Sequence, residues 1–160
     1  YGIRPLVALK AYKCYGDKAL ENVHNDPYVI CGAQIGASFS EADALALELG
    51  IEGDSINRAM AAVMFELRHN SGLGHCFIPK NKLISATAKL ISVPEELISD
   101  AIDALCERGD LVCDSVAGLD ACYLSKLFYA ESDTADRLKL MGLPWLRWEY
   151  GRTLWHWIRL

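Results

Sequence analysis

Apolar residues recur at helical spacing from the start of the chain. The pattern predicts a short helix from Pro5 to about Tyr15, where Gly16 stops it. A second helix begins with Asp17 as its N-cap and runs to about Asn25. The Asp-Pro pair that follows ends this helix, because the residue before a proline is pushed out of the α region.

A third helix is predicted within the stretch "GASFSEADALALELGI", residues 36–51. Ser40 followed by Asp43 gives a start that resembles a capping box. The apolar stripe consists of Ala42, Leu45, Ala46 and Leu49. Residues 1–53 are therefore predicted to be short helices joined by tight turns.

Residues 54–74 carry the clearest helical pattern, with Asp54 or Ser55 as the N-cap. Their apolar positions follow 3, 4 spacing: Ile56, Ala59, Met60, Val63, Met64 and Leu67. We interpret this segment as a linking helix.

Residues 75–131 change to a mixed pattern. A strand is predicted around Cys76 to Ile78, a helix from Pro79 through Leu90, and another from Pro94 to Arg108. Leu111 to Cys113 and Ala121 to Leu124 are predicted to form a small β-hairpin. The order strand, helix, helix, strand, strand is that of a winged helix.

The last segment, residues 132–160, is predicted to hold the rest of a helix from Leu127 to Met141 and a Trp-rich tail. The tail "WLRWEYGRTLWHWIRL" contains all four tryptophans of the chain. It could stack on single-stranded bases, lie at a membrane interface, pack against a partner, or be an unrelated extension.

Composition narrows the class of protein. The 160 residues are 52% hydrophobic with a net charge of −5, typical of a globular, helix-rich chain without a basic patch. The apolar runs are too short to span a bilayer and nothing resembles a signal peptide, so a cytoplasmic location is expected, with no membrane partner. The six cysteines lack a CxxC pair, which predicts reduced thiols.

Phosphate-transfer chemistry is excluded by the motifs. A P-loop needs GxxxxGK[ST], and no such string occurs. Neither GxSxG nor HExxH is present, and His69, His75 and Cys76 have the wrong spacing for zinc. We therefore expect no catalytic residue, metal site or cofactor in these residues.

The two predicted modules differ in their suitability for DNA. The helix from Pro94 to Arg108 presents Glu95, Glu96, Ser99, Asp100, Asp103 and Glu107, and a duplex would repel it. Lys80 and Lys82, at the start of the preceding helix, are the only nearby side chains that favour DNA binding by this module.

The first fifty residues are typical of the helix-hairpin-helix, in which a glycine turn aims helix N–H groups at a backbone phosphate. The turn Gly2-Ile3-Arg4-Pro5 suits this role, with Lys10 and Lys13 on the helix that follows. The turn at Gly36 and Ser38 suits it less, because Glu41 and Asp43 occupy the anion position of the next helix. Packing without any ligand is the alternative for this second turn.

These segments together resemble a known family. The quoted strings are "YGIRPLVALKAYKCYGDKALENVHNDPYVI", "FSEADALALELGI", "GHCFIPKNKLISATAKLISVPEELISDAIDALCERGDLV" and "YLSKLFYAE". In order and spacing, from Tyr1 to about Glu131, they resemble the accessory region N-terminal to the motor of RecD-like superfamily 1 DNA helicases, often described as the exodeoxyribonuclease V alpha chain. The resemblance implies a mainly α fold: tandem helix-hairpin-helix units, then a winged-helix-like module.

The family's second hairpin reads glycine-apolar-glycine-Phe followed by Lys-Thr-Ala-Asp. Phe39, Ala42 and Asp43 fit this pattern, whereas Ser38 and Glu41 replace the second glycine and the lysine. In the first hairpin Gly2, Ile3 and Pro5 agree with the family.

The resemblance implies a non-catalytic accessory fragment of an ATP-dependent 5′ to 3′ DNA helicase that functions in DNA repair. ATP and Mg²⁺ would belong to motor domains outside these residues, and those motor domains would be partners. The expected ligand is single-stranded or forked DNA, bound weakly at the phosphates through Gly2, Ile3, Arg4, Lys10, Lys13, Gly36 and Ser38. The rival hypothesis is a protein-interaction scaffold that never touches nucleic acid.

Overall fold

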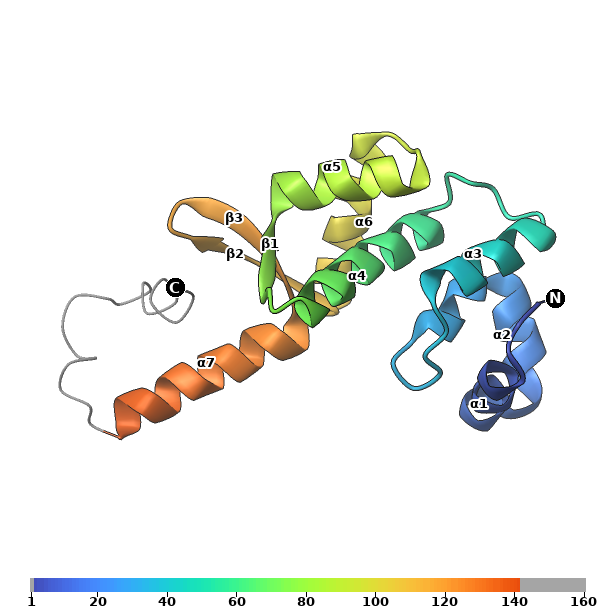
Figure 1. Ribbon diagram of the computed structural model, residues 1–160, viewed down its shortest axis with the longest axis horizontal. Coiled ribbons are helices and arrows are strands. Elements are labelled where there is room, and N and C mark those ends of the chain that lie inside the picture. Colours follow the sequence, from blue (N-terminus) through green and yellow to red (C-terminus); the bar gives the residue numbers. More distant parts are fainter. Residues whose placement is uncertain (1, 142–160) are drawn as a thin grey trace.

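The computed structural model describes residues 2–141, and its helices and strands are shown in Figure 1. Tyr1 and residues 142–160 lie outside the described residues, and with them every expectation for the Trp-rich tail. The helical elements are α1 (Pro5–Tyr15), η1 (Gly16–Lys18), α2 (Ala19–Asn25), η2 (Pro27–Cys31), α3 (Phe39–Glu48), α4 (Ile56–Gly72), α5 (Lys80–Ile91), α6 (Glu95–Glu107) and α7 (Ser125–Leu140). The strands are β1 (Phe77–Pro79), β2 (Leu111–Val116) and β3 (Leu119–Leu124). The fold is therefore mainly helical, with one small sheet.

The predicted helix boundaries are confirmed where glycine, proline or a capping serine determines the local backbone. Gly16 follows α1 with φ of 58°, a left-handed conformation that ends a helix readily only at glycine. Asp26 follows α2 in an extended conformation ahead of Pro27. Ser55 caps α4 by accepting a hydrogen bond from the Arg58 backbone N–H.

Three predicted starts are wrong. Asp17 is not the N-cap of α2, because a turn of 3₁₀ helix comes first and Lys18 takes the cap position. The cap of α3 is Ser38 rather than Ser40, so the helix begins two residues earlier than predicted. Pro79 is the last residue of β1, and α5 begins after it.

The sheet is antiparallel, with the strand order β1-β3-β2. Phe77 pairs with Tyr123 at one side, and Leu111 pairs with Leu124 at the other. Both hairpin strands are longer than the sequence predicted. The two turn residues, Ala117 and Gly118, have φ of 51° and 80°, which is typical of a two-residue type I′ turn.

Two clusters of buried residues form the core. The first consists of Val7, Ala11, Tyr28, Ile30, Ile35, Ala42, Leu45 and Ala46, from α1, α3 and the segment between them. The second joins α4, α5, α6 and the sheet around side chains such as Val63, Leu83 and Ile102. Phe39 packs against both clusters, and α4 supplies Ala61 to the first and four buried residues to the second.

The far end of the chain extends away from both clusters. In Figure 1 α7 projects beyond the sheet, and none of its described residues is buried. Phe128, near its start, packs edge-on against Tyr123 of β3. Over residues 2–141, no helix combines the length and the apolar composition that a membrane span requires.

Candidate functional site

The two glycine turns singled out in the sequence each lead directly into a helix. Gly2 has φ of 62° and precedes α1, and Gly36 has φ of 74° and precedes α3. Both values lie in the left-handed region that glycine adopts without a steric penalty. The two turns therefore have matching backbone chemistry, and the residues around them decide what each helix start can bind.

The start of α1 is open. Arg4 occupies its N-cap position but makes no side-chain cap, and within this described helix the first turn holds no acidic residue. Gly2, Arg4 and Pro5 are exposed, while Ile3 packs partly against the first core cluster. Pro5 carries no N–H, and the Val7 N–H already donates to the Arg4 carbonyl at 2.9 Å, so the Leu6 N–H is the first-turn donor that an anion would meet.

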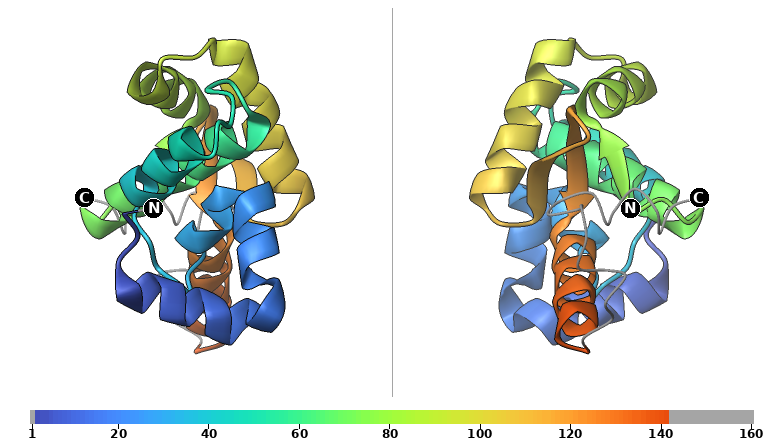
Figure 2. Two further views of the ribbon diagram at one scale, coloured as in Figure 1. Left: turned by 90° about the vertical axis from the view of Figure 1, so that its right-hand side faces the viewer. Right: turned by 90° about the vertical axis from the view of Figure 1, so that its left-hand side faces the viewer.

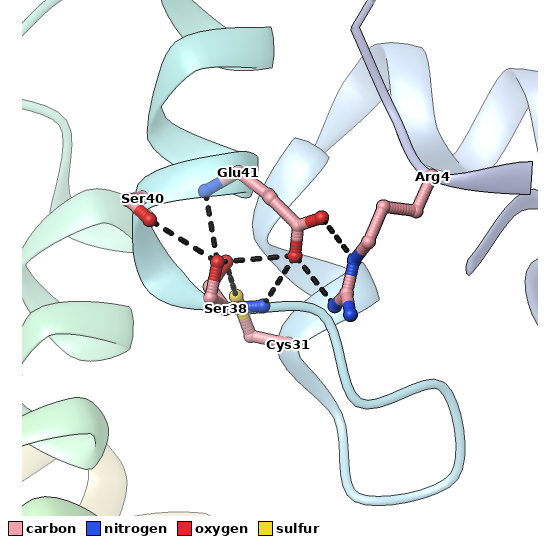
Figure 3. Close-up of polar contacts among 5 residues, drawn as sticks. All are labelled: Arg4, Cys31, Ser38, Ser40 and Glu41. Carbon is pink, nitrogen blue, oxygen red and sulfur yellow. Dashed lines mark hydrogen bonds and ion pairs between the residues drawn. The ribbon is translucent and has the colours of Figure 1, made fainter. Parts of the chain in front are cut away.

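The start of α3 already holds an anion. Ser38 and Glu41 form a capping box: the Glu41 backbone N–H donates to Ser38 Oγ, and the Ser38 backbone N–H donates to Glu41 Oε2 at 2.9 Å. Figure 3 shows the Glu41 carboxylate beside the start of α3, between Ser38 and Arg4. A phosphate approaching α3 would have to displace this carboxylate.

Arg4 joins the two turns through the same carboxylate. Its Nε donates to Glu41 Oε1 and its Nη2 donates to Glu41 Oε2 at 2.8 Å, a bidentate arrangement drawn in Figure 3. These hydrogen bonds, with that from the Ser38 backbone N–H, lower the pKa of Glu41 to about 2. The carboxylate is therefore ionised at neutral pH, and it neutralises the cation of the first turn.

Lys10 also connects the two turns. A Cβ added to Gly36 would lie 4.0 Å from Lys10 Nζ, so the α1 lysine reaches the second turn. Lys13, one helical turn further along α1, is exposed. The structure thus brings Arg4 and Lys10 of the first unit to Ser38 and Gly36 of the second, with Lys13 beside them on α1.

Asp43 was expected beside Glu41 at the start of α3, and that expectation is wrong. Its carboxylate instead accepts two hydrogen bonds from Arg58 of α4, at 2.7 and 3.0 Å, and one from the Tyr28 hydroxyl at 2.7 Å. Arg58 also donates to the Ile91 carbonyl at the end of α5. Hydrogen bonds from Arg58 lower the pKa of Asp43. This cluster fastens α3 to α4 and leaves no charge available for a ligand.

The contacts of Arg58 and Asp43 could not be predicted from spacing, because the residues that they join are 15 positions apart or more. Arg58 lies on the side of α4 opposite to the apolar stripe, so its burial had no local signal in the sequence. Its side chain is only 16% exposed, and a guanidinium at that depth needs a carboxylate partner.

A groove of about 560 Å³ lies between α4, α6 and residues 26–33. Arg68 and Arg108 line it, but Arg68 donates to the Cys31 carbonyl and Arg108 pairs with Asp110 at 3.0 Å. Asp26 also faces the groove. Its charges are largely balanced, so it offers no strong preference for an anion.

The polar face of α6 keeps the character that the sequence predicted. Glu95, Glu96, Asp100, Asp103 and Glu107 are exposed. Lys80 of α5, which favoured DNA binding in the sequence, forms an ion pair with Asp103 at 3.1 Å. This part of the described chain therefore presents negative charge to any ligand.

Groups that could hold a metal ion are absent from residues 2–141. Residues 1–77 match the family model described as the ATP-dependent RecD2 DNA helicase HHH domain. The matched range contains both glycine turns, the Arg4–Glu41 pair and the whole of α4. The resemblance to the accessory region of RecD-like helicases is confirmed over these residues.

Proposed function

The chain carries a RecD-like helix-hairpin-helix region, and from this premise we propose that it is a non-catalytic accessory part of a DNA helicase that binds DNA without regard to sequence. The contact would be to backbone phosphates through Gly2, Ile3 and the start of α1, with Lys10 and Lys13 assisting. The observation that carries the proposal is the open start of α1, which has neither a side-chain cap nor an acidic residue in its first turn.

Arg4, Gly36 and Ser38 have a smaller share in this proposal. Arg4 would reach a phosphate only by leaving Glu41, and the N–H of Ser38 is already bonded to that carboxylate. With a net charge of −5 and few free cations, we expect micromolar or weaker affinity and a steep dependence on salt. Single-stranded or forked DNA is the expected ligand.

The wider role is inferred from the family match. ATP and Mg²⁺ would be bound by motor domains of the parent helicase, and those domains would be partners in DNA repair in the cytoplasm. The helix-hairpin-helix region would be residues 1–53, the linking helix 54–74, and a winged-helix-like module 75–131. The strand order β1-β3-β2 around α5 and α6 supports the winged-helix interpretation.

Fluorescence anisotropy with a labelled oligothymidine at low salt tests the DNA contact. The variant Lys10→Glu with Lys13→Glu is compared with Lys82→Glu with Lys89→Glu, which makes the same charge change on exposed positions of α5. Figures 1 and 2 place α5 and α1 at opposite sides of the molecule.

The α1 pair should weaken binding about tenfold and make the salt slope shallower by about 1.4, because two phosphate contacts are lost. The α5 pair should have a much smaller effect. Equal weakening by both pairs would mean that binding follows net charge alone and that α1 has no special role.

A protein-interaction scaffold is the second candidate, favoured by the five exposed carboxylates of α6. A basic surface on a partner would complement this face. Absence of oligonucleotide binding at low salt, together with capture of the motor domains by the wild-type chain, would favour the scaffold over the DNA contact.

A further inference from the structure

Three cysteine thiols from three different elements meet at the β-hairpin. Cys113 Sγ of β2 lies 3.2 Å from Cys122 Sγ of β3 and 3.5 Å from Cys106 Sγ, near the end of α6. All three thiols are free. Neither the family match, which ends at residue 77, nor the proposed DNA contact gives them a role.

The hairpin register makes one of the two pairs suitable for a disulfide. Cys113 and Cys122 are directly opposed across the two strands. Val116 and Leu119 are opposed at the two-residue turn, and in such a hairpin the pair that flanks the turn is a hydrogen-bonded one. Alternation along the ladder then makes Cys113 and Cys122 a non-hydrogen-bonded pair, whose Cα atoms lie about 4.5 Å apart. A disulfide accepts that separation without movement of the backbone.

Exposure divides the roles of these two thiols. Cys113 is exposed, whereas Cys122 is completely buried. A small oxidant in solution therefore reaches Cys113 first, and Cys122 lies directly opposite it on the neighbouring strand. Cys122 Sγ is also nearer to Cys113 Sγ than Cys106 Sγ is, at 3.2 Å against 3.5 Å. Cys122 is therefore the better placed thiol to attack an oxidised Cys113.

We propose that Cys113 and Cys122 are an oxidation site that hydrogen peroxide converts to a cross-strand disulfide. Cys113 Sγ attacks one peroxide oxygen, the O–O bond breaks, and the thiol proton leaves with the second oxygen as water. The product is a sulfenic acid on Cys113. Cys122 Sγ then attacks Cys113 Sγ, the S–O bond breaks, and a second water leaves. Two thiols lose two electrons, and one peroxide gains them.

Trypsin gives a direct test on the full chain. It cuts after Lys89, Arg108 and Lys126, so the peptide 109–126 holds both Cys113 and Cys122, and the peptide 90–108 holds Cys106. After peroxide treatment and alkylation of the remaining thiols, peptide 109–126 should be unalkylated and lighter by two hydrogens. Dithiothreitol should restore both alkylation sites.

Variants sharpen the test. Cys106→Ser should leave this internal disulfide unchanged, and so should the control Cys14→Ser, whose thiol bonds to Gln34 rather than to another cysteine. Cys122→Ser should abolish the disulfide and leave oxygen on Cys113. The wild-type mass alone decides the matter even if Cys122→Ser does not fold. A covalent link between peptides 90–108 and 109–126, or oxygen added to Cys113 with no loss of hydrogen, would overturn the proposal.

Discussion

The helices α1 and α3 each follow a glycine in the left-handed conformation, yet their first turns are in opposite electrostatic states. The first turn of α1 has no cap and no acid, whereas that of α3 holds the carboxylate of Glu41 in a capping box. The same backbone bend therefore prepares one helix start for an external anion and fills the other with an internal one. The identity of the residue three positions after the cap makes this difference.

The largest expected effect tests whether α3 is a packed element. Arg58→Ala should lower the free energy of unfolding by about 2 to 3 kcal/mol, because it leaves the Asp43 carboxylate without its guanidinium partner. Urea denaturation measures the change. The control Arg137→Ala, on the exposed face of α7, should stay within about 0.5 kcal/mol. A loss as small as the control's would mean that α3 is not fastened through Asp43.

The next effect identifies the residue that caps α3. Ser38→Ala should cost about 1 kcal/mol of stability, whereas Ser38→Gly should cost only a few tenths. Ser40→Ala, which removes only a hydroxyl contact to Ser38 at 3.1 Å, should be close to neutral. Thermal unfolding followed by circular dichroism distinguishes the three. A larger loss for Ser40→Ala than for Ser38→Ala would contradict the capping box.

A smaller effect is expected when the internal anion is removed. Glu41→Gln frees Arg4 and removes one negative charge, so oligothymidine binding should tighten about threefold. Adding Arg4→Met should cancel the gain, while Arg4→Met alone should change little because Glu41 already holds that side chain. Glu107→Gln, an exposed acid on α6, controls for net charge. An equal gain from Glu107→Gln would show that the position of the carboxylate does not matter.

The smallest expected effect is a change in how stability depends on pH. The pKa of Glu41 falls from 4.5 to about 2 on folding, so its ionised form stabilises the fold above the unfolded value, and this contribution is lost as pH falls from 4.5 towards 2. Glu41→Gln should therefore flatten the acid side of the stability curve. Unfolding midpoints at pH 6 and pH 3 test this, and parallel curves for the two proteins would contradict it.

Sequence reasoning succeeded where a local rule fixes the backbone. Gly16 and the Asp26-Pro27 pair were predicted correctly, and Ser55 was one of the two caps proposed for α4, because each acts on its own turn. It failed where two local rules compete: Ser38 with Glu41 and Ser40 with Asp43 both have the capping-box spacing. Only the long-range pairing of Asp43 with Arg58 decides between them, and that pairing depends on how α3 packs against α4.

The candidate site was likewise predictable in its local features and not in its long-range contacts. Its residues could be named from the glycine turns, and residues 1–77 match a RecD2 HHH domain. The Arg4–Glu41 bridge, which joins residues 37 positions apart, could not be predicted from spacing. The cysteine cluster was likewise hidden, because Cys106, Cys113 and Cys122 meet only after the hairpin folds under α6.

The position of α4 between the two clusters of buried residues affects how the molecule would come apart. Its side chains belong to both clusters, so neither cluster can loosen without baring part of this helix to water. We therefore expect one cooperative unfolding transition in calorimetry rather than two. Cleavage of the chain on either side of α4 should leave fragments with exposed apolar surface. The stability of the two clusters is therefore tied together through the packing of α4.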